Sequence, residues 1–156
     1  MLAEAARVLR PGGLFISGEW DRVPSLGDRT LDTAGVIPNT TRLIDRVDKI
    51  IEGSYQTVPA ASLIPRWVAD SGLFRDITHE FHEIPIGDWH PDDRQRALGI
   101  TLRDQAVRYG DSLRQVLKNA EEEQEVIDQL INGYLAEIQS VPGMIYVYHT
   151  VHAIKA

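Results

Sequence analysis

The spacing of apolar residues predicts an alternation of helices and strands along the chain. Positions three or four residues apart predict helices, and continuous or alternating apolar runs predict strands. The predicted helices cover 2–9, 43–53, 60–71, 90–120 and 126–138, and the predicted strands cover 14–20, 74–85 and 144–154. The order is therefore helix, strand, helices, strand, two long helices and a last strand, which is typical of an α/β domain.

The first and last strands differ from ordinary surface strands. Leu14-Phe15-Ile16 is a continuous apolar run, which is typical of a strand covered on both faces. The strand over 144–154 carries apolar or aromatic residues on both faces, so we expect it at the centre of the sheet. Between the first strand and the helix over 43–53, prolines and glycines predict a long loop over 21–41 with one helical turn at most. In the helix over 60–71, Pro65 marks either a start or a kink.

Composition narrows the class of protein without naming a chemistry. The 156 residues amount to one domain, and the 43% apolar and 25% charged fractions are those of a globular protein. A formal net charge of −7 argues against nucleic acid or an anionic membrane as a partner. The absence of cysteine excludes disulfides and thiolate sites. No apolar run reaches the roughly 18 residues of a membrane helix, and the charged first ten residues do not resemble a signal peptide, so we expect a cytoplasmic protein.

A few side chains are candidates for chemistry. Glu19 and Trp20 end the first strand, at the sheet edge where α/β proteins bind ligands, so Glu19 could act as an acid or base and Trp20 as a substrate platform. The alternative is a solvated carboxylate beside a packed indole. His149 and His152 are candidates for a general base, against the alternative of hydrogen-bonded structural histidines.

The histidines do not predict a metal site. His79 and His82 differ in strand parity and point to opposite faces, and His149 and His152 do the same. None shows the i, i+4 helical spacing of a zinc pair. The sequence therefore predicts no metal.

The opening stretch resembles a known segment. Residues 4–16, EAARVLRPGGLFI, resemble the helix, turn and fifth strand of class I S-adenosylmethionine-dependent methyltransferases. Residues 63–74, LIPRWVADSGLF, are similar to the helix before the family's sixth strand. Residues 83–89, EIPIGDW, resemble a segment of fungal secondary-metabolism methyltransferases, and the two long helices and last strand also match that subgroup.

The resemblance implies a specific fold. We expect a truncated, Rossmann-like methyltransferase C-terminal half with about three strands and several helices, in which 1–156 form a single domain that lacks the N-terminal cofactor-binding half. By resemblance, the first strand pairs with the last, and the last runs antiparallel beside the middle one. The other edge of the first strand is then bare, so we expect a homodimer, or a heterodimer with a protein that supplies the N-terminal half.

The resemblance also bears on cofactor and substrate. The family holds S-adenosylmethionine through a Gly-rich turn after its first strand, and these residues contain no GxGxG-type turn. We therefore expect no cofactor for the isolated chain, and S-adenosylmethionine only if a partner supplies the missing half. The family covers its substrate cavity near the PIG segment, so Trp89 and His90, with Trp20 and Tyr109, are the candidate substrate pocket.

Three functional hypotheses follow. The first is a methyltransferase-like protein that binds a small apolar metabolite and steers a cyclisation or isomerisation without independent methyl transfer. The second is one half of a split methyltransferase, and the third is a structural fragment without chemistry.

Overall fold

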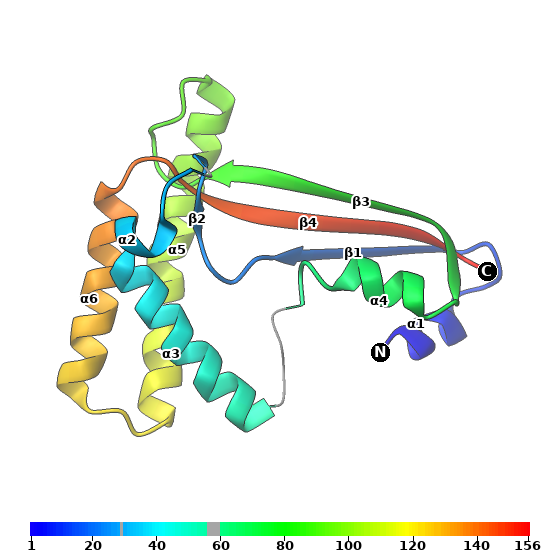
Figure 1. Ribbon diagram of the computed structural model, residues 1–156, viewed down its shortest axis with the longest axis horizontal. Helices are drawn as coiled ribbons and strands as arrows, with labels where there is room; N and C mark the ends of the chain where they lie inside the picture. Colours follow the sequence, from blue (N-terminus) through cyan, green and yellow to red (C-terminus); the bar gives the residue numbers. More distant parts are fainter. Residues whose placement is uncertain (29, 56–59) are drawn as a thin grey trace. The chain divides into compact units, whose positions relative to one another are not determined.

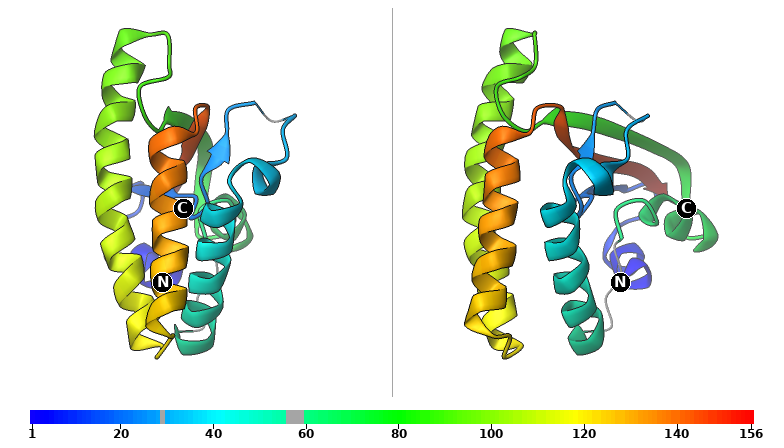
Figure 2. Two further views of the ribbon diagram at one scale, coloured as in Figure 1. Left: turned by 90° about the vertical axis from the view of Figure 1, so that its left-hand side faces the viewer. Right: turned by 60° about the vertical axis from the view of Figure 1, so that its left-hand side comes forward.

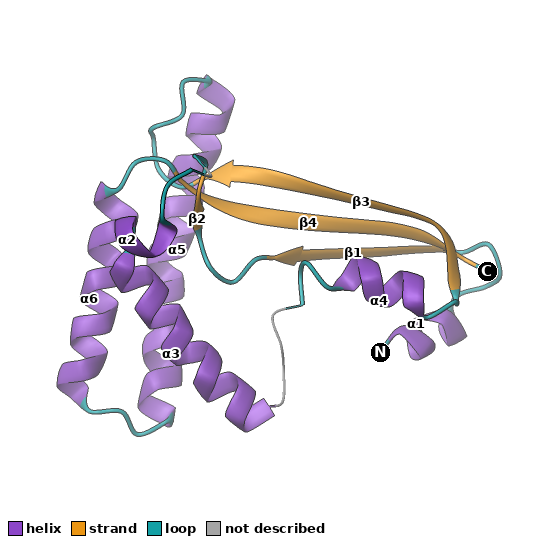
Figure 3. Cartoon of the chain, viewed as in Figure 1, coloured by secondary structure: helices purple, strands orange, loops and turns teal. Residues whose placement is uncertain are grey.

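A computed structural model describes residues 1–28, 30–55 and 60–156, and these form six helices and four strands. They divide into two compact units (Figures 1 and 3). Unit 1 comprises the described residues of 1–21, 60–82 and 147–156, and unit 2 comprises those of 22–55 and 83–146. The elements are α1 (Leu2–Val8), β1 (Leu14–Trp20), β2 (Ser25–Leu26), α2 (Thr33–Val36), α3 (Pro38–Tyr55), α4 (Ile64–Asp70), β3 (Phe74–Pro85), α5 (Asp93–Asn119), α6 (Gln124–Ser140) and β4 (Met144–Lys155).

Strand β4 is the centre of an open antiparallel sheet. It pairs with β1 from Leu14↔Ile154 to Trp20↔Tyr148, with β2 through Ser25↔Ile145, and with β3. The predicted central position of the last strand and its pairing with the first are confirmed. The prediction of about three strands was wrong by one, because β2 has only two residues, too few to show strand periodicity. The predicted mixed α/β class is confirmed. The strands among the described residues pair antiparallel, so these residues do not show the parallel sheet of a Rossmann-like fold.

In unit 1, one face of the sheet packs against α1 and α4. The buried cluster there consists of Ala6, Ile64, Val68, Phe74, Val151 and Ala153. The opposite face of β1 is open: Leu14 is 54% exposed and Ile16 is 60% exposed. The expectation of a strand covered on both faces was therefore wrong for the described residues, because α1 and α4 cover one side only. Helix α4 begins next to Pro65, which settles the choice between a start and a kink in favour of a start.

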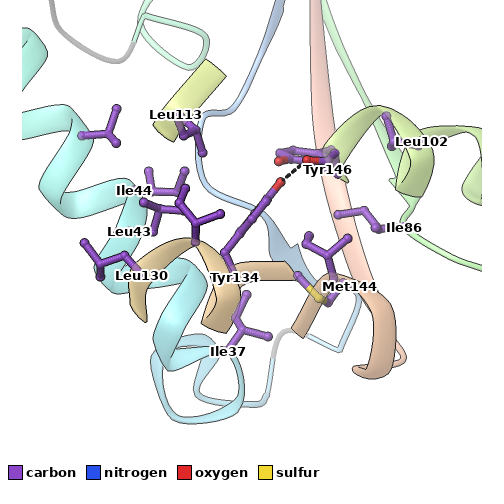
Figure 4. Close-up of a cluster of buried hydrophobic side chains, with 14 of the residues drawn as sticks. Ile37, Leu43, Ile44, Ile86, Leu102, Leu113, Leu130, Tyr134, Met144 and Tyr146 are labelled. Carbon is purple, nitrogen blue, oxygen red and sulfur yellow. Dashed lines mark hydrogen bonds between the residues drawn. The ribbon is translucent and has the colours of Figure 1, made fainter. Parts of the chain in front are cut away.

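In unit 2, three helices lie side by side around one apolar core (Figure 2). The core side chains recur every three or four residues on α3, α5 and α6, as the sequence pattern predicts for the two long helices. Figure 4 shows part of this core, in which Tyr134 and Met144 are fully buried. None of the helices in the described ranges is both long and apolar enough to cross a membrane.

Helix α3 begins earlier than predicted. It starts at Pro38, inside the segment predicted as a loop, because proline is well suited to the first turn of a helix. A buried carboxylate on α6 caps that turn. Glu137 accepts hydrogen bonds from the backbone N–H groups of Asn39 (2.9 Å) and Thr40 (2.7 Å) and from the Asn39 side-chain amide (2.6 Å). Its negative charge is therefore held by the positive end of the α3 dipole.

The turn before α5 depends on a close approach of two backbones. Gly87 adopts a φ of +98° and donates its N–H to the carbonyl of Gly99 at 2.8 Å. A Cβ placed on Gly99 would lie 2.2 Å from the Gly87 carbonyl oxygen. Gly99 is therefore the position at which the turn of residues 85–87 packs on α5, and a side chain there would push the two backbones apart.

We predict that Glu137→Gln lowers the free energy of unfolding by roughly 1–3 kcal/mol, because the amide cannot accept all three hydrogen bonds and a buried donor is left unsatisfied. Urea unfolding followed by circular dichroism measures the change. Glu125→Gln, an exposed carboxyl on the same helix, is the control and should shift stability by no more than about 0.5 kcal/mol. Equal midpoints for the two variants would contradict a capping role for Glu137.

Candidate functional site

Unit 1 contains a line of three side chains that run from a carboxylate through two imidazoles. Nε2 of His149 lies 3.3 Å from Oδ2 of Asp21, and Nδ1 of His149 lies 3.0 Å from Nε2 of His79. The two rings are nearly parallel in plane, at 6°, and their centroids are 5.3 Å apart. Since the centroids are much farther apart than the nitrogens, the rings meet edge to edge, as an N–H···N hydrogen bond requires. We call Asp21, His149 and His79 the imidazole line.

The three members differ in exposure. His149 is 9% exposed, Asp21 is half-buried and His79 is exposed. Nε2 of His149 is buried and makes no well-formed hydrogen bond, so the nearby Asp21 carboxylate is the group that can offset its desolvation. The line therefore passes from the half-buried Asp21 through the buried His149 to the exposed His79.

Strand pairing places these residues together. His149 lies opposite Glu19 in the β1–β4 ladder, and Asp21, which follows β1, donates its backbone N–H to the Val147 carbonyl at 2.9 Å. On β3, residues 77, 79 and 81 share a face by the alternation of strand side chains. The contacts of His79 and Phe81 with His149 show that this is the face toward Asp21 and Glu19.

A bulge in β3 decides this orientation. Phe74 and Ile77 are three residues apart and both join the cluster beneath α1 and α4. Asp76 between them has a φ of +51°, in the left-handed region that is uncommon for residues other than glycine. The extra residue shifts the alternation, so His79 comes to the same face as Phe74.

An exposed aromatic ring borders the imidazole line. Phe81 is 59% exposed, and its ring centroid is 6.4 Å from that of His149. Glu19 contributes a second carboxylate to the same face through its register with His149. The surface around His79 therefore combines an apolar ring with negative charge.

The other candidates in unit 1 lie on the opposite face. His152 is exposed and stands opposite Ile16 in the ladder. Trp20 packs against Tyr148, with ring centroids 4.7 Å apart, and the Tyr148 hydroxyl occupies the space that a Cβ on Gly18 would fill. Trp20 and His152 thus share a face with Leu14 and Ile16 and are separate from the imidazole line.

The candidates in unit 2 do not form one site. The Trp89 indole donates its N–H to the Met144 carbonyl at 3.2 Å and packs against His90, with ring centroids 5.4 Å apart. Nδ1 of His90 accepts the backbone N–H of Asp92, the residue that caps α5. These contacts give Trp89 and His90 structural roles in the turn that leads into α5.

Tyr109 belongs to a group of tyrosines in unit 2. The Tyr146 hydroxyl donates to the Tyr134 hydroxyl, which donates in turn to the Ala106 carbonyl at 2.9 Å (Figure 4). Burial raises the pKa of Tyr134 to about 12 and raises the pKa of Tyr146 well above its ordinary value. Burial also raises the pKa of Tyr109, an effect that the nearby Arg22 guanidinium opposes. The fold therefore holds these phenols in their neutral form.

A cavity of about 350 Å³ lies between α3 and α6, and none of the predicted site residues lines it. Its walls mix both charges with apolar side chains, and an ion pair between Arg46 and Glu122 forms part of them. The lining residues are Arg42, Asp45, Arg46, Lys49, Glu122, Val126, Gln129 and Leu130.

Among the described residues, no group of three or more His, Asp or Glu side chains is arranged to hold a metal ion. The imidazole line does not qualify because the two nitrogens of His149 point to different partners. The sequence pattern indicates His149 as a candidate base but gives no such sign for Asp21, His79 or Phe81. Strand parity relates histidines within one strand, whereas this site depends on the register between strands.

We predict that stability declines above about pH 10, the ordinary pKa of tyrosine. The unfolded chain releases the Tyr134 proton near pH 10 and the folded chain only near pH 12. The stabilisation is therefore complete below pH 10 and falls by about 1.4 kcal/mol per pH unit up to pH 12. Urea unfolding at roughly pH 9 and pH 11 measures the decline, which should be shallower in Tyr134→Phe. An equal decline in that variant would contradict the assignment.

No protein-family model matches the chain, and no curated protein has significant sequence similarity to it.

Proposed function

We propose that this chain is a methyltransferase-like protein that binds a small apolar metabolite beside the imidazole line and transfers a proton in a cyclisation or isomerisation. The observation that carries the proposal is the contact series Asp21–His149–His79, with nitrogen–oxygen and nitrogen–nitrogen distances of 3.3 and 3.0 Å. Proton transfer of this kind needs a positioned base and a bound substrate, and both requirements can be met by side chains alone.

The type of reaction follows from what an imidazole can do. Cyclisations and isomerisations of carbonyl compounds begin with removal of a proton from carbon or oxygen and end with its return. A positioned general base contributes roughly 10²- to 10⁴-fold to the rate of such a step. Histidine suits this role near neutral pH because its ordinary pKa lies close to the working pH.

The family part of the proposal is supported by the chain's strand order. The antiparallel pairing of β1 with β4, and the place of β4 beside β3, agree with the order that the resemblance of residues 4–16 and 63–74 implies. The apolar character of the ligand follows from Phe81, whose ring is exposed next to His149 and offers a flat surface for stacking.

We predict that 2-naphthol, a small aromatic probe, binds at Phe81 and shifts the amide NMR signals of the residues around His79 and His149. Phe81→Ala should weaken the affinity by about tenfold, because the stacking surface is lost. Trp20→Ala is the matched control, since it removes an exposed aromatic ring from the opposite face of the same sheet and should leave the affinity unchanged. Loss of binding in the Trp20 variant alone would contradict the proposed site.

A second candidate is one part of a split S-adenosylmethionine-dependent methyltransferase. The observation that favours it is the open apolar face of β1, where Leu14, Ile16 and Trp20 are exposed. Exposed apolar surface of this kind marks an interaction site on many proteins, and β1 is also an edge strand of the sheet. A second copy of this chain, or a protein with the N-terminal half of the fold, would pack there.

We predict that isothermal titration of the chain with S-adenosylmethionine shows no binding, since these residues contain no Gly-rich turn to hold the cofactor. Binding appearing only after a second protein is added would support the split enzyme. Micromolar binding to the chain by itself would contradict both candidates.

A further inference from the structure

We infer that Nδ1 of His79 is the terminal base of the imidazole line, that Asp21 and His149 fix its tautomer, and that its substrate is a neutral, flat carbon acid. This inference rests on the proposed function and adds to it the atom that takes the proton, the role of each residue and the chemical class of the substrate.

The protonation pattern follows from the contacts of His149. Its Nε2 lies 3.3 Å from the Asp21 carboxylate, which can only accept a hydrogen bond, so the proton of the neutral ring belongs on Nε2. The opposite tautomer would place the buried lone pair of Nε2 against the carboxylate and leave Nε2 without a donor. Nδ1 of His149 is therefore an acceptor.

The same reasoning continues to His79. Since Nδ1 of His149 accepts, Nε2 of His79 must donate across the 3.0 Å contact. The neutral His79 ring then carries its lone pair on Nδ1, and His79 is exposed. The line thus leaves a lone pair on the exposed ring of His79, with its tautomer set by the buried His149.

The proton step balances within these groups. A C–H bond next to a carbonyl breaks, a bond forms between that proton and Nδ1 of His79, and the electron pair stays on the substrate as an enolate. The imidazolium that results donates through Nε2 to Nδ1 of His149, whose own Nε2 lies 3.3 Å from the Asp21 carboxylate. Return of the proton to another carbon completes an isomerisation and restores the neutral ring. His149 and Asp21 act through His79, so both are positioning residues.

The surroundings of the line select the substrate class. Glu19 on β1 and Asp21 just after that strand place two carboxylates on this face, so an anionic substrate would be repelled. Phe81 offers an exposed ring of the size of a flat aromatic or enone system. A neutral, planar molecule with one acidic C–H bond therefore fits both the charge and the shape.

The first test is the tautomeric state, measured by long-range ¹H–¹⁵N correlation NMR on the full chain with labelled histidine. We expect a proton on Nε2 of both His149 and His79 near neutral pH. In Asp21→Asn, the His149 signal should change tautomer or become a mixture, because an amide can also donate. A proton on Nδ1 of His149 in the unaltered chain would overturn the inference.

The second test uses 5-nitrobenzisoxazole, a neutral, flat carbon acid that a base converts to a coloured cyanophenolate by removing one C–H proton and breaking the N–O bond. His79→Ala should lower the rate at least tenfold, and added imidazole should restore part of it. His82→Ala is the matched control, since this histidine is exposed on the opposite face of the same strand, and its rate should equal that of the unaltered chain. Equal rates for the two variants would overturn the inference.

The positioning role is tested by the same reaction in Asp21→Asn and His149→Phe. Both should lower the rate and move the midpoint of its pH profile, because each substitution breaks the series of contacts that joins His79 through His149 to the Asp21 carboxylate, while Glu19 keeps its place opposite position 149. An unchanged profile in both would overturn the positioning role. The two proposals fail separately. If the tautomers are as expected and elimination depends on His79, but 2-naphthol does not bind, the proposed metabolite site is contradicted and the assignment of His79 as the base stands. If 2-naphthol binds at Phe81 but the tautomers or the His79 dependence differ from expectation, the base assignment is contradicted and the metabolite site stands.

Discussion

The central position of β4 is the constraint on which both the sheet and the candidate site depend. The alternation of strand side chains fixes the sheet face on which each β4 side chain lies. Pairing with β1 and β3 then fixes which side chains of those strands lie beside it. In the β1–β4 ladder, His149 pairs with Glu19, and His152 pairs with Ile16. A shift of one residue would move His149 to the open face and separate it from His79. The apolar side chains Val151 and Ala153, buried under α1 and α4, oppose such a shift because they would have to enter water.

The elements themselves were readable from the sequence because each carries a local signal. The two long helices have apolar stripes, Gly13 comes directly before the strand Leu14–Trp20, and Pro85 ends the strand Phe74–Pro85, so these limits follow from local residues. The resemblance also anticipated that the first strand pairs with the last. The sequence pattern predicts the start of helix α3 too late, because Pro38 lies among loop-forming residues although proline also fits a first helical turn. Its cap, Glu137, lies far along the chain on α6, where no local pattern marks it.

The candidate site was only partly predictable, for a reason of geometry. His149 was identified from its place in the last strand, but its partners come from β3 and from the residue after β1. The face of His79 depends on the bulge at Asp76, which reverses the alternation between Phe74 and Ile77. A count of strand parity from the sequence assumes a regular strand, so it cannot detect that reversal. Trp89 and His90 were expected at a substrate cavity, but their hydrogen bonds stabilise the turn before α5.

The two faces of the sheet in unit 1 suit different kinds of partner, because one carries the polar contacts of the imidazole line and the other carries exposed apolar side chains. On one face, the buried Nε2 of His149 has, among the described residues, only the Asp21 carboxylate close enough to offset its desolvation, and this requirement fixes the hydrogen bond between His149 and the exposed His79. On the other face, Leu14 and Ile16 are exposed beside His152, and this mostly apolar surface gains more from a large apolar partner than from a metabolite. A partner protein and a small substrate would therefore use opposite faces of the same strands. A second chain on the open face could then stiffen β1 and β4, and with them the register that holds Asp21 and His149 together, without touching the base itself.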